Sequence, residues 1–100
     1  MTLHTVSKSP LTSNALESCL RICQPGDSIL LLEDGVYAAS ANIAPDSILS
    51  ALDLVEKIYV LSEDVDARGI TGLLVPDVKT IDYEGFVELT CVHEKTVSWF

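Results

Sequence analysis

The sequence is poor in basic residues, and this limits what the protein can bind. Lysine and arginine together number 6 against 15 aspartate and glutamate residues, which gives a formal net charge of −9. Such a charge repels a phosphate backbone, and the sequence has no basic cluster with interleaved aromatic residues. Direct nucleic-acid binding is therefore not expected.

Long hydrophobic runs are also missing. No segment approaches the ~20 consecutive apolar residues of a membrane-spanning helix, and residues 1–8 contain no hydrophobic region of a signal peptide. We therefore expect a cytoplasmic protein without membrane contact. The length of 100 residues, 48% of them hydrophobic, predicts a single domain over residues 1–100 around one core.

Cysteines are few and odd in number, which favours reduced thiols over a disulfide framework. Cys19 and Cys23 are one helical turn apart, where Cβ atoms are ~5–6 Å apart, whereas a disulfide prefers about 3.8 Å. These two residues, Cys91, His4 and His93 lack the paired spacing of a zinc site, so we expect no metal and no cofactor. As a nucleophile, Cys19 would need partial exposure and a nearby positive charge, and a buried unreactive thiol is the simpler interpretation.

The segment from Ile29 to Leu32 is the centre of the predicted fold. Its four consecutive apolar residues do not alternate with polar ones, which is typical of a strand covered on both faces. Glu33, Asp34 and Gly35 then end the run abruptly. Polar chemistry is therefore expected to begin at the carboxyl end of a central strand.

Strands and helices alternate along the rest of the chain. Further strands are predicted at residues 3–6, 57–61 and 80–82, and helices at about 14–23, 46–55, 64–68 and 84–93. Ser13 or Asn14 can cap the first helix, and β-branched residues leave a strand as the alternative for residues 84–93. The pattern predicts an α/β fold with a small, mostly parallel sheet of about four or five strands and helices on both faces.

Two acidic doublets follow predicted strands at an interval of 30 positions. Glu33-Asp34 and Glu63-Asp64 would meet at one edge of a parallel sheet, where clustered carboxylates could hold magnesium as in phosphoryl-accepting receiver domains. Lys79 precedes the fourth strand, whereas that chemistry needs a lysine after a late strand. Acidic residues that cap short helices and solvate a turn are the simpler interpretation.

Several segments, taken in order, are similar to one known family. They are His4-Thr-Val with Lys8-Ser-Pro10, Gly26-Asp27 with Leu30-Leu-Leu-Glu-Asp-Gly-Val-Tyr-Ala38, Tyr59-Val-Leu with Glu63-Asp64 and Ala67-Arg-Gly69, and Asp82-Tyr83 with Gly85-Phe-Val and Leu89-Thr90. With Trp99 near the end, these segments resemble the TusB/DsrH family over almost the whole chain.

The resemblance implies a flavodoxin-like subunit of a heterohexamer built from two copies of three related chains, TusBCD or DsrEFH. The implied partners are TusC/DsrF-like and TusD/DsrE-like subunits and small carriers of the TusA-like and TusE/DsrC-like kinds. Such complexes relay sulfur as cysteine persulfides. In the Tus branch the sulfur goes toward 2-thiouridine at the tRNA wobble position, and the Dsr branch serves the oxidation of stored sulfur.

The resemblance also bears on individual residues. The principal sulfur-accepting cysteine belongs to the TusD/DsrE-like chain, but DsrH-type members carry a cysteine in the first helix, and Cys19 matches that position. Cys19 is thus a candidate sulfur carrier, and the alternative is a non-catalytic scaffold that positions the thiol of a sister chain. Asp34, Gly35, Tyr37 and Trp99 are candidate subunit contacts.

Overall fold

The computed structural model describes residues 1–43, 57–76 and 78–100. The helix predicted over residues 46–55 lies outside these ranges. The described helices and strands, in chain order, are β1 (Thr2–Val6), α1 (Ala15–Ile22), β2 (Ser28–Leu31), the 3₁₀ helix η1 (Glu33–Ala39), β3 (Lys57–Leu61), α3 (Ser62–Ala67), the 3₁₀ helix η2 (Thr71–Leu73), β4 (Lys79–Ile81), α4 (Tyr83–Val92) and β5 (Lys95–Trp99). None of the helices in these ranges is long and apolar enough to cross a bilayer.

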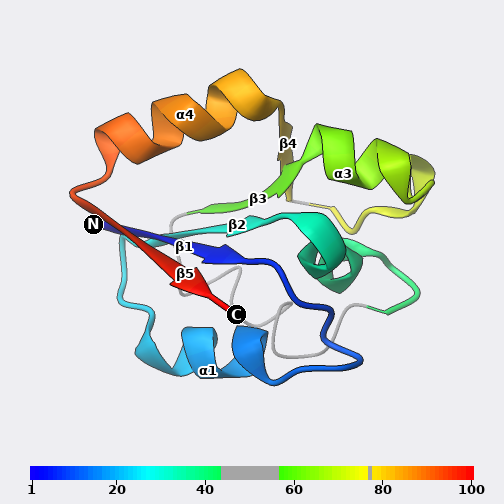
Figure 1. The fold of residues 1–100 in the computed structure, drawn as a ribbon, viewed down its shortest axis with the longest axis horizontal. Helices are drawn as coiled ribbons and strands as arrows, with labels where there is room; N and C mark the ends of the chain where they lie inside the picture. The colour runs from blue at the N-terminus through cyan, green and yellow to red at the C-terminus, as the bar shows by residue number, and fades with distance from the viewer. Residues whose placement is uncertain (44–56, 77) are drawn as a thin grey trace.

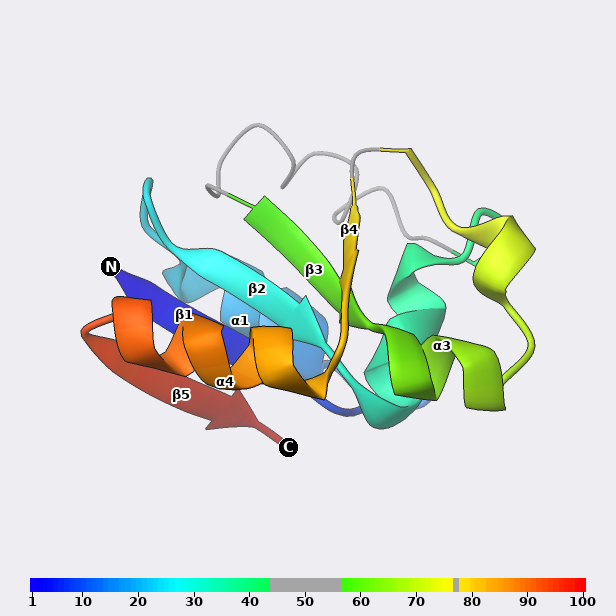
Figure 2. The same cartoon turned by 90° about the horizontal axis from the view of Figure 1, so that it is seen from above.

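The strands form one five-stranded sheet in the order β4-β3-β2-β1-β5, and every neighbouring pair is parallel. Figure 1 shows α1 below the sheet and α4 above it, and Figure 2 shows the same layers from above. The fold class predicted from the sequence is therefore confirmed. The last helix is also confirmed as a helix, since Tyr83–Val92 is α-helical.

The predicted central strand is the middle of the sheet. All four residues of β2 are buried, with β1 on one side and β3 on the other. Side chains alternate between the two faces of a strand, so Ile29 and Leu31 point toward α1 and Leu30 points toward α4. The apolar residues of β2 do not alternate with polar ones because both faces of the strand are covered, as expected.

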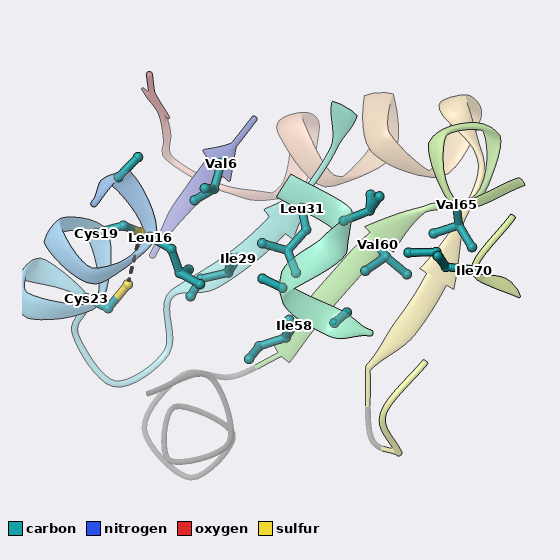
Figure 3. Close-up of a cluster of buried hydrophobic side chains, with 14 residues drawn as sticks. Val6, Leu16, Cys19, Cys23, Ile29, Leu31, Ile58, Val60, Val65 and Ile70 are labelled. Carbon is teal, nitrogen blue, oxygen red and sulfur yellow. Dashed lines mark hydrogen bonds between the residues drawn. The ribbon is translucent and has the colours of Figure 1, made fainter. Parts of the chain in front are cut away.

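The main core lies on the α1 face. It is a cluster of buried side chains from β1, α1, β2, η1, β3, α3 and the loop after α3, and Figure 3 shows it. Leu16 and Cys19 of α1 and Cys23 at its C-cap are buried in this cluster, and Leu20 packs partly against it.

The opposite face is covered differently. Leu3 and Leu30 are fully buried there, yet α4 itself has no buried residue. Its C-terminal end is held to the sheet by His93, whose ring nitrogens contact the Leu89 carbonyl oxygen at 2.7 Å and the Ser28 hydroxyl at 3.0 Å. The helix therefore rests on the sheet with one face and leaves the other in solvent.

Local features add detail to the prediction. Trp99 belongs to a fifth strand, β5, for which no residue range was predicted and which pairs with β1 along its whole length. The turn expected after β2 is the start of η1. Of the two predicted capping residues, Ser13 makes the hydrogen bond, since its hydroxyl accepts one from the Ala15 N–H at 3.1 Å, and the Asn14 side chain makes none.

Candidate functional site

The carboxylate of Asp27 is the centre of a buried polar network between β1 and the turn that precedes β2. It accepts hydrogen bonds from the backbone N–H groups of Thr2 and Gln24, each at 3.0 Å, and lies 3.0 Å from Nε2 of His4. His4 and Asp27 are only 3% and 6% exposed. The register that places Leu3 opposite Ser28 brings these two side chains together.

Trp99 extends this network to β5. Its indole N–H donates to Nδ1 of His4 at 3.1 Å. An indole can only donate, so Nδ1 of His4 must be an acceptor, and the ring proton then lies on Nε2, directed at Asp27. The hydrogen bonds thus define which ring nitrogen of His4 faces each partner, Nδ1 toward Trp99 and Nε2 toward Asp27.

The same hydrogen bonds determine the ionisation of Asp27. Burial by itself raises the pKa of this carboxyl, but the bonds from Gln24 N–H, His4 and Thr2 N–H outweigh burial and hold the pKa below its ordinary value. Asp27 is therefore an anion at neutral pH, held by the hydrogen bonds of this buried network.

Cys19 and Cys23 lie beside this network on the inner face of α1. Their sulfur atoms are 3.8 Å apart, both thiols are free, and Cys19 is fully buried (Figure 3). The hydrogen bond with Cys23 raises the pKa of Cys19 far above its ordinary value, and burial raises it further. The same bond lowers the pKa of Cys23 against the opposing effect of burial. Cys19 is therefore held as a protonated thiol, and the 3.8 Å between the two sulfur atoms is well beyond the length of a disulfide bond.

The fold gathers potential ligand atoms that the sequence keeps far apart. One ligand atom each from His4, Cys19 and Cys23 lie within 4.8 Å of one another, and all three residues are buried. Their lack of paired spacing is the basis of the prediction of no metal site, and that prediction considered positions along the sequence alone. The register of β1 with β2 places His4 over α1 and could have revealed this cluster. That register cannot be read from local spacing in the sequence.

The acidic doublets do meet at one edge of the sheet, as predicted. The Glu33 N–H donates to the Asp64 carboxylate at 2.6 Å, and Arg68 lies 2.9 Å from Asp34 and 3.5 Å from Asp64. Glu63 is hydrogen-bonded to the Tyr83 N–H at 3.2 Å. The carboxylates of Asp34, Glu63 and Asp64 are thus engaged by backbone N–H groups and a guanidinium, in agreement with the capping interpretation.

The candidate contact residues differ in exposure. Asp34 is exposed, Tyr37 and Trp99 are half-buried, and Gly35 is buried. A Cβ atom on Gly35 would overlap the carbonyl oxygen of Val6, so a requirement of the fold itself explains this glycine. Cys91 is exposed on α4.

Comparison with known protein families and sequences agrees with the family resemblance described above. A family model described as "DsrH like protein" matches residues 8–96. The Protein TusB of Shigella flexneri and that of Escherichia coli O81 (strain ED1a) are each 41% identical over 98 residues, which cover 97% of this chain and 99% of the relative. The chain belongs to the DsrH/TusB family.

Solved structures agree with this DsrH/TusB assignment at the level of the fold. The ychN protein from Escherichia coli superposes with a TM-score of 0.79 at 19% identity and covers 98% of both chains. Protein MTH1491 from Methanobacterium thermoautotrophicum gives a TM-score of 0.70 at 11% identity, with 97% of this chain and 96% of that chain covered.

Proposed function

We propose that this chain is a subunit of a persulfide sulfur-relay complex of the TusBCD or DsrEFH kind. The observation that carries the proposal is the 41% identity to TusB along 98 residues, which cover 99% of that relative. The formal charge of −9 suits contacts with protein carriers in the cytoplasm better than contacts with RNA.

Within such a complex, we propose that the chain is a scaffold and does not itself carry sulfur. A sulfur acceptor must offer an accessible thiolate. Cys19 is fully buried, and its pKa is raised by the hydrogen bond with Cys23. These properties favour a relay in which a sister subunit supplies the reactive thiol. Sulfur carriage by Cys19, suggested by its place in the first helix, is the competing proposal.

Mass spectrometry after incubation with a persulfidated donor protein separates the two roles. A persulfide adds one sulfur atom, about 32 Da, to a thiol. The scaffold role predicts no such addition on Cys19, in the isolated chain or in the assembled complex. An addition that maps to Cys19 and is lost in Cys19→Ser would overturn the scaffold role in favour of sulfur carriage.

Co-expression tests membership in the complex itself. The chain is expected to co-purify with TusC/DsrF-like and TusD/DsrE-like partners as a particle with two copies of each, measured by size-exclusion chromatography with light scattering. Partners that assemble while this chain elutes alone would contradict the proposal. Loss of wobble 2-thiouridine from tRNA after gene disruption would then assign the Tus branch, and unchanged tRNA with impaired sulfur oxidation would assign the Dsr branch.

A further inference from the structure

The cluster of His4, Cys19 and Cys23 has features that neither the sulfur-relay role nor the packing of α1 requires. Three side chains of ligand type converge in the described part of the chain, with one ligand atom each within 4.8 Å of the others. Their exposed fractions are 3%, 0% and 7%. A buried free cysteine usually behaves as a small hydrophobic side chain, whereas here two thiols and an imidazole are gathered at one buried position.

The separation of the sulfur atoms fits a metal ion. Two thiolates bound tetrahedrally to zinc at ~2.3 Å lie roughly 3.8 Å apart, and Sγ of Cys19 is 3.8 Å from Sγ of Cys23. A disulfide would need about 2.05 Å. The two sulfurs can therefore hold an ion between them with little movement of α1.

The charge of the donor set also suits a buried site. Zn²⁺ with two thiolates and a neutral imidazole has no net charge, which keeps the cost of burial low. Binding forms two Zn–S bonds and one Zn–N bond, and it releases the two thiol protons to solvent without any oxidation or reduction. Gln24 and Pro25, which follow Cys23 in the sequence, are exposed.

Asp27 supplies the outer partner that metal-binding histidines require. Such a histidine usually donates its second ring N–H to a carboxylate, which fixes the tautomer and raises the basicity of the ligating nitrogen. Nε2 of His4 lies 3.0 Å from the Asp27 carboxylate, and this leaves Nδ1 to bind the ion. Nδ1 now accepts a hydrogen bond from Trp99, so the indole and a metal compete for the same lone pair.

We propose that His4, Cys19 and Cys23 form a zinc site in which Asp27 orients the imidazole and Trp99 restrains it. Three protein ligands leave a fourth position for water, the arrangement of zinc sites with an open coordination position. The site is complete within this chain, so its test is independent of whether the chain joins a sulfur-relay complex.

The first experiment uses Co²⁺ as a spectroscopic probe of the reduced, full-length chain. One Co²⁺ per chain is expected, with an intense visible spectrum typical of tetrahedral coordination and a thiolate-to-cobalt charge-transfer band in the near ultraviolet. One equivalent of Zn²⁺ should abolish both. The charge-transfer band should be lost in Cys19→Ser/Cys23→Ser and retained in Cys91→Ser, which removes the exposed cysteine of α4. Absence of the band in the folded wild-type chain, or its loss in Cys91→Ser, would overturn the site.

Two variants test the second sphere. Asp27→Asn should weaken zinc binding by roughly 10- to 100-fold, the usual effect of losing an outer-sphere partner. Trp99→Phe should tighten zinc binding about two- to tenfold, because it removes the competing hydrogen bond to His4. A purely structural role for Trp99 predicts equal or weaker binding, so this direction discriminates between the two.

Zinc K-edge absorption on the wild-type chain needs no variant and remains valid if a cysteine substitution prevents folding. The expected shell has two sulfur ligands at about 2.3 Å and a nitrogen at about 2.0 Å. A shell of oxygen and nitrogen alone would show an adventitious ion and would overturn the proposal.

Discussion

Gly35 shows how one missing side chain sets the path of the backbone after the central strand. A Cβ atom at this position would overlap the Val6 carbonyl oxygen, which already accepts a hydrogen bond from Leu32 N–H at 3.1 Å. We predict that Gly35→Ala lowers the free energy of unfolding by about 3 kcal/mol, the upper end of the cost of overpacking, because backbone must shift. Urea unfolding measures the change.

Gly72→Ala is the matched control for this substitution. A Cβ at Gly72 would have no heavy atom within 4 Å, and the residue is exposed in η2. We expect the free energy of unfolding of Gly72→Ala to stay within about 0.5 kcal/mol of the wild-type value. Equal losses in the two variants would refute the steric explanation for Gly35.

Asp27 links the buried network to the pH dependence of stability. Its pKa is below the ordinary value in the folded chain, so the unfolded chain binds more protons as the pH falls. The stability that this carboxylate contributes is therefore fully present above a pH of about 3.9, the pKa of an unperturbed aspartate. It is lost as the pH falls through the lower folded pKa.

We predict that Asp27→Asn lowers the free energy of unfolding by roughly 1–3 kcal/mol at neutral pH, because the hydrogen bonds to a buried charge are lost. The difference from the wild type should shrink as the pH falls below about 3.9, the pKa of an unperturbed aspartate. Asp34→Asn, at a side chain that is 61% exposed, serves as control. Urea unfolding at several pH values measures both, and a deficit for Asp27→Asn that stays constant with pH would contradict the role assigned to its charge.

At the level of elements, α4 depends on its N-cap more than α1 does. The Asp82 side chain accepts a hydrogen bond from Gly85 N–H at 2.8 Å, whereas Asn14 makes no side-chain cap bond to α1. Because α4 buries no residue, the cap is a large part of what holds its first turn. We predict a loss of about 0.5–2 kcal/mol for Asp82→Ala and little change for Asn14→Ala, measured by urea unfolding followed by circular dichroism. Equal effects would contradict this difference between the caps.

The elements that could be predicted from the sequence are those with a strong local signal. The unbroken run in β2 and the stripe of Leu16, Cys19 and Cys23 in α1 record burial directly. β5 could not be recognised in the same way, because as an edge strand it has exposed and half-buried residues and no apolar run.

The site was predictable only in part, for a related reason. The meeting of the acidic doublets follows from parallel strands alone, so it could be inferred from their positions. The approach of His4 to Cys19 and of Trp99 to His4 depends on register between strands that are distant in sequence. Register is set by packing of the whole sheet and is not encoded in spacing.

At the scale of the whole molecule, two neighbouring aromatic residues at the end of β5 allow folding and assembly to be tested separately. Trp99 is half-buried and hydrogen-bonded to His4, so Trp99→Ala would change both stability and assembly. Phe100 beside it is 86% exposed and contributes little to the fold. Large aromatic side chains are enriched in protein interfaces. Phe100 is therefore the better probe of the subunit contact expected near Trp99.

We predict that Phe100→Ser leaves the free energy of unfolding of the isolated chain, measured with urea, within about 0.5 kcal/mol of the wild-type value. Its affinity for the partner subunits should fall by about tenfold or more, as expected for an interface aromatic worth ~1.4 kcal/mol or more. Ile22→Ser is the matched control, because Ile22 is 55% exposed at the end of α1. Affinity is measured by titration of labelled chain with the co-purified partners. If both variants assemble as well as the wild type, the end of β5 is free of partners, and contact must lie elsewhere.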